Sequence, residues 1–255
     1  MGSLARHQNK PTIRRSHSQL ELLVSERTAA LQTLSQRLLR VQDEERRRVA
    51  RDLHDSTGQT LTALKLSVAL LRQRLENDER TRKELSDIAL LADQALQEIR
   101  TTSYLLHPPL LDEAGFASAA RWYVEGFAQR SGVKVRADFS PEVERLPDVI
   151  ETALFRVLQE SLTNVHRHSG TSEVDVRFWR AAQAVILEVR DYGRGIPEEL
   201  LSRSGPIRDF GVGLAGMRER VNELKGDLEI ASADPGTMLR AIVPLFSQAA
   251  SAQSG

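Results

Sequence analysis

The sequence contains no cysteine, only 5% aromatic residues, and no excess of either charge. Without cysteine there is no disulfide bond and no thiolate metal site, and the composition suits a reducing compartment. Lysine plus arginine and aspartate plus glutamate each number 35, so net charge indicates neither direct nucleic-acid binding nor an anionic membrane partner. No apolar run approaches the roughly 20 residues that cross a bilayer. We therefore expect a cytoplasmic protein.

The N-terminal part divides into a polar tail and a helix. Residues 1–18 are polar and begin Met-Gly-Ser, so we expect them to be disordered or left over from cloning. From residue 19 the composition favours helix, and four apolar residues follow the alternating three and four spacing of a coiled-coil seam. These are Leu31, Leu34, Leu38 and Val41. We predict a coiled-coil signalling helix over 19–45, and a disordered tail over 247–255 at the other end.

Two further apolar runs predict a helical hairpin over residues 46–109. The polar residues 77–81 suit the turn, and Pro108-Pro109 ends the second helix. The first run is out of phase with the coiled-coil seam, so the seam is expected to stutter near residue 54. One hairpin leaves its stripe half covered, which predicts dimerisation into a four-helix bundle. The runs are Leu61, Leu64, Val68, Leu71, Leu75 and Leu85, Ile88, Ala92, Ala95, Ile99, Thr102, Leu106.

The second half alternates helix and strand signals and predicts an α/β-sandwich domain over 110–246, joined by a linker at 110–115. We expect a helix over 148–168, capped by Asp148 and ended near Gly170. The fold class is thus multidomain, α and α+β. The other expected elements are a helix at 116–130, strands at 133–139, 173–179 and 184–190, a helix ending near 224, and a hairpin of strands 228–231 and 238–243.

His54 is followed directly by Asp55 and, one turn later, by Gln59. On a regular α-helix His54 lies at the edge of the apolar stripe, with Asp55 and Gln59 on the wet side. Asp55 can accept a ring proton and leave the other imidazole nitrogen as a nucleophile, while the Gln59 amide can orient a water. A solvated helix face explains a lone His-Asp pair equally well.

The helix predicted over 148–168 carries a second polar cluster. Glu160 and Asn164 are one turn apart and share a face that the apolar residues leave free. Asn164 offers an oxygen to a hard cation such as Mg²⁺, and Arg167 with His168 can meet phosphate one turn further on. Read alone, the pair is more often an ordinary exposed pair.

Asp191 ends a predicted strand and is followed by Gly193 and Gly195. A carboxylate at a strand end can accept a hydrogen bond from an exocyclic amine, and the two glycines let the backbone pass close to a flat ligand. A plain turn explains this D-x-G-x-G string equally well.

A second glycine-rich string, Gly211 to Met217, opens a helix whose N-terminal amide groups suit phosphate. It resembles a dinucleotide fingerprint only loosely. A preceding strand and an acidic residue about twenty positions on within a parallel βαβ unit are both lacking, which excludes a Rossmann site.

The order of these motifs resembles the ATP-binding module shared by histidine kinases, type II topoisomerases, Hsp90 chaperones and mismatch-repair ATPases. With His54-Asp55 upstream on a hairpin, the chain resembles a sensor histidine kinase of the class that partners NarL/LuxR-type response regulators, as in nitrate sensors and DesK-like thermosensors. The resemblance covers about Leu34 to Leu245. It implies ATP and Mg²⁺ as cofactors, a homodimer, a response-regulator partner, and an upstream sensor or membrane region that this chain does not contain.

The resemblance also implies roles for particular residues. His54 would be the phosphoacceptor, Asp55 its base, and Gln59 the residue that positions water for dephosphorylation of the regulator. Asn164 would bind Mg²⁺ with support from Glu160, and Asp191 would bind the adenine amino group. A polar lid would span about 196–210. The remaining ATP-site residues would be Arg167, His168, Gly193, Gly195, Gly211, Gly213, Leu214, Gly216 and Thr237.

Two other functions fit these motifs. An ATPase of the same superfamily would hydrolyse ATP to drive a conformational cycle, and His54 would be incidental. A non-catalytic dimeric scaffold would carry a vestigial ATP site, against which Asn164, Asp191 and the intact glycines argue.

Overall fold

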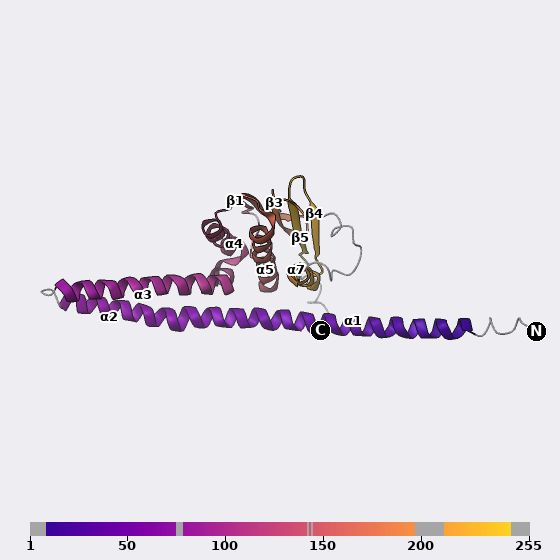
Figure 1. Ribbon diagram of the computed structural model, residues 1–255, viewed down its shortest axis with the longest axis horizontal. Helices are drawn as coiled ribbons and strands as arrows, with labels where there is room; N and C mark the ends of the chain where they lie inside the picture. The colour runs from indigo at the N-terminus through magenta and orange to yellow at the C-terminus, as the bar shows by residue number, and fades with distance from the viewer. Residues whose placement is uncertain (1–8, 75–78, 142, 144, 197–211, 246–255) are drawn as a thin grey trace, which may run out of the picture. The chain divides into compact units, whose positions relative to one another are not determined.

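The computed structural model describes residues 9–74, 79–141, 143, 145–196 and 212–245 (Figure 1). The chain forms two compact units, Met1–Asp43 and Glu44–Gly255. Helix α1 (Asn9–Asp52) supplies the first unit, so the predicted disorder of residues 1–18 is wrong for 9–18. Pro11 lies in the first turn, where backbone N–H groups have no intrahelical partner and proline is tolerated. The seam leucines and Val41 are each more than half exposed in the single chain.

The second unit begins with the helical hairpin, which we define as residues 44–106. After α1 come the π-helical turn η1 (Leu53–Thr57), α2 (Gly58–Arg74) and α3 (Glu79–Leu106). Helices α2 and α3 run side by side (Figure 1), joined by an ion pair between Lys65 and Asp93. The predicted turn falls partly on residues 75–78, outside the described residues. No helix in the described part of the chain is both long and apolar enough to span a membrane.

The remaining described elements form the α/β module, residues 109–245. A five-stranded sheet has the order β1-β2-β3-β5-β4, with β1 parallel to β2 and all other pairs antiparallel. The helices cover one face of the sheet (Figure 1). The elements are α4 (Pro109–Ser131), β1 (Lys134–Phe139), α5 (Asp148–Asn164), η2 (Val165–Ser169), β2 (Glu173–Ala181), β3 (Ala184–Asp191), α7 (Val212–Glu223), β4 (Asp227–Ser232) and β5 (Thr237–Pro244).

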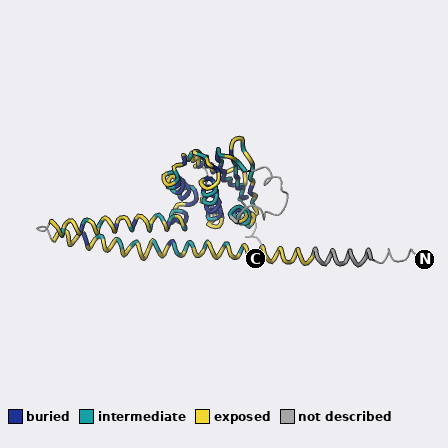
Figure 2. The backbone as a smooth tube through the Cα atoms, viewed as in Figure 1, coloured by how far each residue is buried: buried dark blue, intermediate teal, exposed yellow. Residues whose placement is uncertain are grey.

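The main core lies between this sheet and its helices, where Figure 2 shows most of the buried backbone. Alternate residues of β2, namely Val174, Val176 and Phe178, are buried against the helices. Helix α5 is the central helix, since Leu154, Phe155 and several neighbours are fully buried. The predicted order of a helical hairpin followed by an α/β module is confirmed.

Two local predictions are wrong. The linker expected at 110–115 is the first part of α4, because Pro109 fits the first helical turn and only Gly115 leaves the helix, with φ 80° and ψ −179°. Asp148 is not the N-cap of α5. Pro147 occupies that position without a side-chain hydrogen bond, and Asp148 is the first helical residue, where its charge favours the positive end of the helix.

Candidate functional site

His54 lies in a π-helical turn rather than in a regular α-helix. The Gly58 N–H donates to the carbonyl of Leu53, five residues earlier, which widens the turn. His54, Asp55, Ser56 and Thr57 are consecutively exposed. The prediction that His54 lies at the edge of the stripe assumed 3.6 residues per turn, and this turn overrides that spacing.

Before and after the π turn, the same face of the helix points inward. One series of less exposed positions through this turn is separated by 4, 3, 5, 3, 4 and 3 residues, and the five-residue step crosses η1; Arg47 and Val49 are also partly buried but lie outside this series. The stutter expected near residue 54 therefore takes the form of one wide turn, which holds His54 outward on a helix that packs both before and after it. The positions are Arg46, Ala50, Leu53, Gly58, Leu61, Lys65 and Val68.

Asp191, at the end of β3, is held in a buried position. Asp191 is only 6% exposed, and its Oδ1 accepts a hydrogen bond from the Gly193 N–H at 2.9 Å. Glycine is required at 193 because a Cβ there would come within 2.7 Å of the Ser169 carbonyl carbon. The Arg194 N–H donates to the same Ser169 carbonyl oxygen at 3.0 Å. The Asp191 loop is thus fixed against the end of η2.

The turn before Thr237 packs against the other side of Asp191. Gly236 has φ +100°, and a Cβ there would lie 2.6 Å from the Asp191 carbonyl carbon. Met238 pairs with Arg190 across β5 and β3, so Thr237 and Asp191 lie at the same end of these strands. The roles of Gly236 and Ser169 in shaping this loop were not predicted from the sequence, although Gly236, which follows Asp234-Pro235, was a visible turn signal.

Tyr192 anchors the residue next to Asp191. Its hydroxyl donates to Asp175 Oδ2 at 2.6 Å, and Arg136 Nε donates to Asp175 Oδ1 at 2.6 Å. Burial opposes ionisation of Asp175, but these two hydrogen bonds outweigh it, and the pKa of this carboxyl lies below its ordinary value. The guanidinium groups of Arg136 and Arg190 also lie over the Tyr192 ring. Sequence reasoning gave no signal for this cluster, whose residues come from β1, β2, β3 and the position that follows β3.

The structure brings Glu160 on α5 next to the start of α7. A Cβ added at Gly213 would overlap the Glu160 carboxylate, so the α7 backbone approaches this side chain closely. Leu214 is half-buried against the core, and Gly216 has open space beside it. Asn164 is the last residue of α5, and Arg167 and His168 are exposed on η2, which follows it directly. The expected regular helix over 148–168 therefore changes to π-helix at 165.

Most of the predicted ATP-site residues thus line the ends of α5, β3 and β5 and the start of α7. Gly211 and all of the predicted lid over 196–210 except Ile196 lie outside the described residues. In the part of the chain that the structure describes, no group of three or more histidine, aspartate or glutamate side chains could hold a metal ion.

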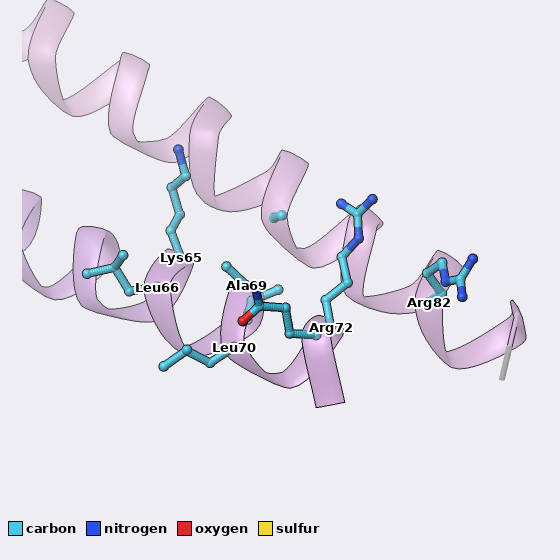
Figure 3. Close-up of a pocket in the computed structure, with 9 residues that line it drawn as sticks. Lys65, Leu66, Ala69, Leu70, Arg72 and Arg82 are labelled. Atoms are coloured by element: carbon cyan, nitrogen blue, oxygen red, sulfur yellow. The ribbon is translucent and has the colours of Figure 1, made fainter. Parts of the chain in front are cut away.

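A shallow groove of about 780 Å³ lies elsewhere, between α2 and α3 (Figure 3). In this view Lys65 points towards α3, whereas Leu66 and Leu70 point away from it. The groove holds none of the predicted site residues.

Two family models match the chain. The model described as "Histidine kinase" matches residues 45–111, and "Histidine kinase-, DNA gyrase B-, and HSP90-like ATPase" matches residues 149–247. The chain therefore belongs to the histidine kinases, and its second match implies that the α/β module binds ATP. Both matches agree with the resemblance to a sensor histidine kinase seen in the sequence.

Named relatives are longer than this chain. Sensor histidine kinase MctS of Rhizobium johnstonii is 34% identical over 224 residues, covering 84% of this chain and 46% of that protein. Signal transduction histidine-protein kinase/phosphatase DegS of Brevibacillus brevis is 30% identical over 221 residues, covering 85% of this chain and 55% of that protein. The chain thus spans about half the length of these relatives.

Among solved structures, the histidine kinase domain of the Erythrobacter litoralis blue-light activated histidine kinase matches with a TM-score of 0.48 at 18% identity. That match covers 73% of this chain and 94% of the solved one.

Proposed function

We propose that this chain is the kinase core of a two-component sensor, which phosphorylates His54 from ATP and passes the phosphoryl group to an aspartate of a NarL/LuxR-type response regulator. The observation that carries the proposal is the wide π turn, which exposes His54 between the buried residues Ala50 and Val68 in a chain that also has an ATP-binding module. The family membership and the kinase/phosphatase named among its relatives support it.

The reaction requires few groups from the hairpin. One imidazole nitrogen of His54 attacks the γ-phosphorus, a nitrogen–phosphorus bond forms, and the phosphorus–oxygen bond to ADP breaks. Asp55 takes the proton from the other ring nitrogen and holds the ring in orientation. Both side chains are exposed, so another surface that carries the nucleotide can reach them.

The α/β module supplies the groups that bind ATP. Asp191 would accept from the adenine amino group, and Thr237 at the same strand ends would share this network. The glycines at 193, 195, 211, 213 and 216, with Leu214, would line the pocket, and Arg167 with His168 would meet the phosphates. The backbone at Gly213 lies close to the Glu160 side chain, which brings the start of α7 next to the Glu160 and Asn164 pair.

The donor set also fits Mg²⁺. Asn164 and Glu160 offer two oxygen-bearing side chains one turn apart, and Mg²⁺ commonly binds through one or two protein groups together with substrate phosphates. When bound, the ion would neutralise charge on the phosphoryl group in transit.

We place the domains as a signalling helix over 19–45, a phosphotransfer hairpin over 46–109 and an ATP-binding domain over 110–246. Several large apolar residues of the hairpin, including Leu64, Leu71 and Ile88, are more than 40% exposed in the single chain. A second copy would bury them in a four-helix bundle, so the functional form is a homodimer. The remaining half of the relatives leaves room for a sensor, and the chain would then be the cytoplasmic part of a membrane-anchored sensor.

The test is incubation of the purified chain with Mg²⁺ and γ-labelled ATP. We expect label on the protein that is lost in acid and kept in alkali, as phosphohistidine requires. Hydrolysis of ATP with no protein label would support the ATPase function instead, and absence of nucleotide binding would support the scaffold.

Replacing Gln59 by alanine should leave labelling of His54 intact but slow dephosphorylation of the regulator about tenfold or more, because a group that orients water is lost. The measurement is the decay of phosphorylated regulator in the presence of each protein. Gln73→Ala is the matched control, since it changes the same residue type at another exposed position of α2. A normal decay rate with Gln59→Ala would refute the role of this side chain.

A further inference from the structure

Asp112, in the first turns of α4, joins elements that are far apart in the sequence. Arg47 on α1 donates from Nε to Asp112 Oδ2 at 3.1 Å, and its second guanidinium nitrogen lies 3.0 Å from Oδ1. His107 Nε2 lies 3.1 Å from the same Oδ1. Arg145 donates to the Asp112 backbone carbonyl at 2.7 Å. We call these four residues the Asp112 junction.

Neighbouring contacts hold the same region together. The Ser103 hydroxyl, buried on α3, donates to the Ala50 carbonyl on α1 at 2.8 Å. From α5, Arg156 and Gln159 donate to the last α3 carbonyls, those of Leu106 and Leu105, each at 2.8 Å. The α/β module is therefore attached to the end of α3, and the Asp112 junction attaches it to α1.

His107 sits at the pivot between the hairpin and the module. It is 3% exposed, its Nδ1 has no hydrogen-bond partner, and Pro108 follows it. Burial lowers the pKa of His107, opposed by Asp112 and assisted by Arg156 and Arg47, so the ring favours its neutral form. Neutral His107 leaves Arg47 as the cation that pairs with Asp112.

Arg47 and His54 are seven residues apart on one continuous helical segment, so a contact at Arg47 bears on the placement of His54. In the described residues, no hydrogen bond or ion pair joins His54, Asp55 or Gln59 to the ATP-site residues, and η1 packs against α2 and α3. Transfer to His54 requires the reacting atoms to approach within about 3–3.5 Å. A module that is to reach the His54 of its own chain must therefore move relative to α1, and the Asp112 junction opposes that movement.

We propose that the Arg47–Asp112 ion pair is a latch: closed, it restrains phosphotransfer to His54, and its opening frees the ATP-binding module to reach the histidine. This inference rests on the proposed kinase function and adds a regulatory step to it. The pair suits a reversible latch because Arg47 is 40% and Asp112 28% exposed. Partly exposed ion pairs are weak enough for a change in α1 to break them.

The first arm of the test compares initial rates of self-labelling. Arg47→Gln and Asp112→Asn should each raise the rate about two- to fivefold, the range expected for loss of one partly exposed pair. The KM for ATP should stay unchanged, because the ATP site is not altered. The double variant should be no faster than the faster single one, because both remove the same interaction. Arg48→Gln is the matched control, since Arg48 pairs with Glu45 on its own helix.

The second arm closes the latch covalently. Because the chain has no cysteine, Arg47→Cys combined with Asp112→Cys gives a single pair of thiols for a short bifunctional maleimide. Efficient internal cross-linking, which needs no kinase activity, supports the junction. The cross-linked protein should lose most of its self-labelling while still binding ATP, and the uncrosslinked double variant should be at least as fast as wild type.

The outcomes separate the two proposals. Unchanged or lower rates in Arg47→Gln and Asp112→Asn, or full activity of the cross-linked protein, would overturn the latch and leave the kinase function standing. A wild-type protein that binds ATP but never acquires acid-labile label would overturn the kinase function, and the latch with it, whatever the cross-linking yield.

Discussion

His54→Gln is expected to abolish acid-labile labelling completely while ATP binding and stability stay at wild-type levels. Glutamine is polar and of similar size, but its amide is not a nucleophile, so no nitrogen–phosphorus bond can form. His54 is exposed in η1, and surface substitutions of this kind usually change the free energy of unfolding by no more than about 0.5 kcal/mol. The measurement is label per dimer after acid and alkali treatment, beside nucleotide titration of the same preparations.

His166→Gln is the matched control for this prediction. His166 is an exposed histidine on η2 whose ring lies edge-on to Phe127, and no role is assigned to it. It should keep its label. Label that persists on His54→Gln would move the phosphoacceptor elsewhere, and its loss from both variants would point to a general effect on the protein.

The surroundings of His54 show which structural features the sequence periodicity can predict and which it cannot. The repeating apolar residues predicted a helical hairpin and a stutter near the histidine, and both agree with the structure. The form of the stutter was not predictable. A wheel at fixed angular steps cannot represent one turn with an additional residue, and hydrogen bonding from Gly58 to Leu53 leaves no mark in residue type.

In the α/β module, too, some features could be predicted from the sequence and others could not. Alternation and glycine punctuation located its strands, because side chains that alternate between core and solvent leave a period of two. The parallel pairing of β1 with β2 and the packing of Gly193 on Ser169 depend on contacts between distant segments. Those contacts determine the environment of Asp191, so the string Asp191 to Gly195 suggested a site but not its geometry.

The Asp112 junction had no sequence signal. Arg47 reads as one member of a solvated arginine run, and Asp112 as part of a linker, and 65 residues separate them. The ion pair forms only because the fold brings α1, α3 and α4 together. Polar contacts between modules generally leave no sequence signal, because they use the same residue types as the rest of a protein surface.

Asn164→Asp is expected to weaken binding of Mg-ATP about 100-fold or more while the fold is unchanged. The new carboxylate adds negative charge one turn from Glu160, at the carboxyl end of α5, where the helix dipole is itself negative. It also replaces an amide that can both accept and donate with a group that only accepts. Like-charge contacts of this kind cost several kcal/mol when partly desolvated, which corresponds to the expected loss.

The measurement is calorimetric titration with ATP at fixed Mg²⁺, beside thermal unfolding of the same samples. Asn222→Asp is the matched control, because it makes the same change at an exposed position of α7. Normal affinity of Asn164→Asp would place the cation elsewhere and would leave Glu160 without its proposed partner.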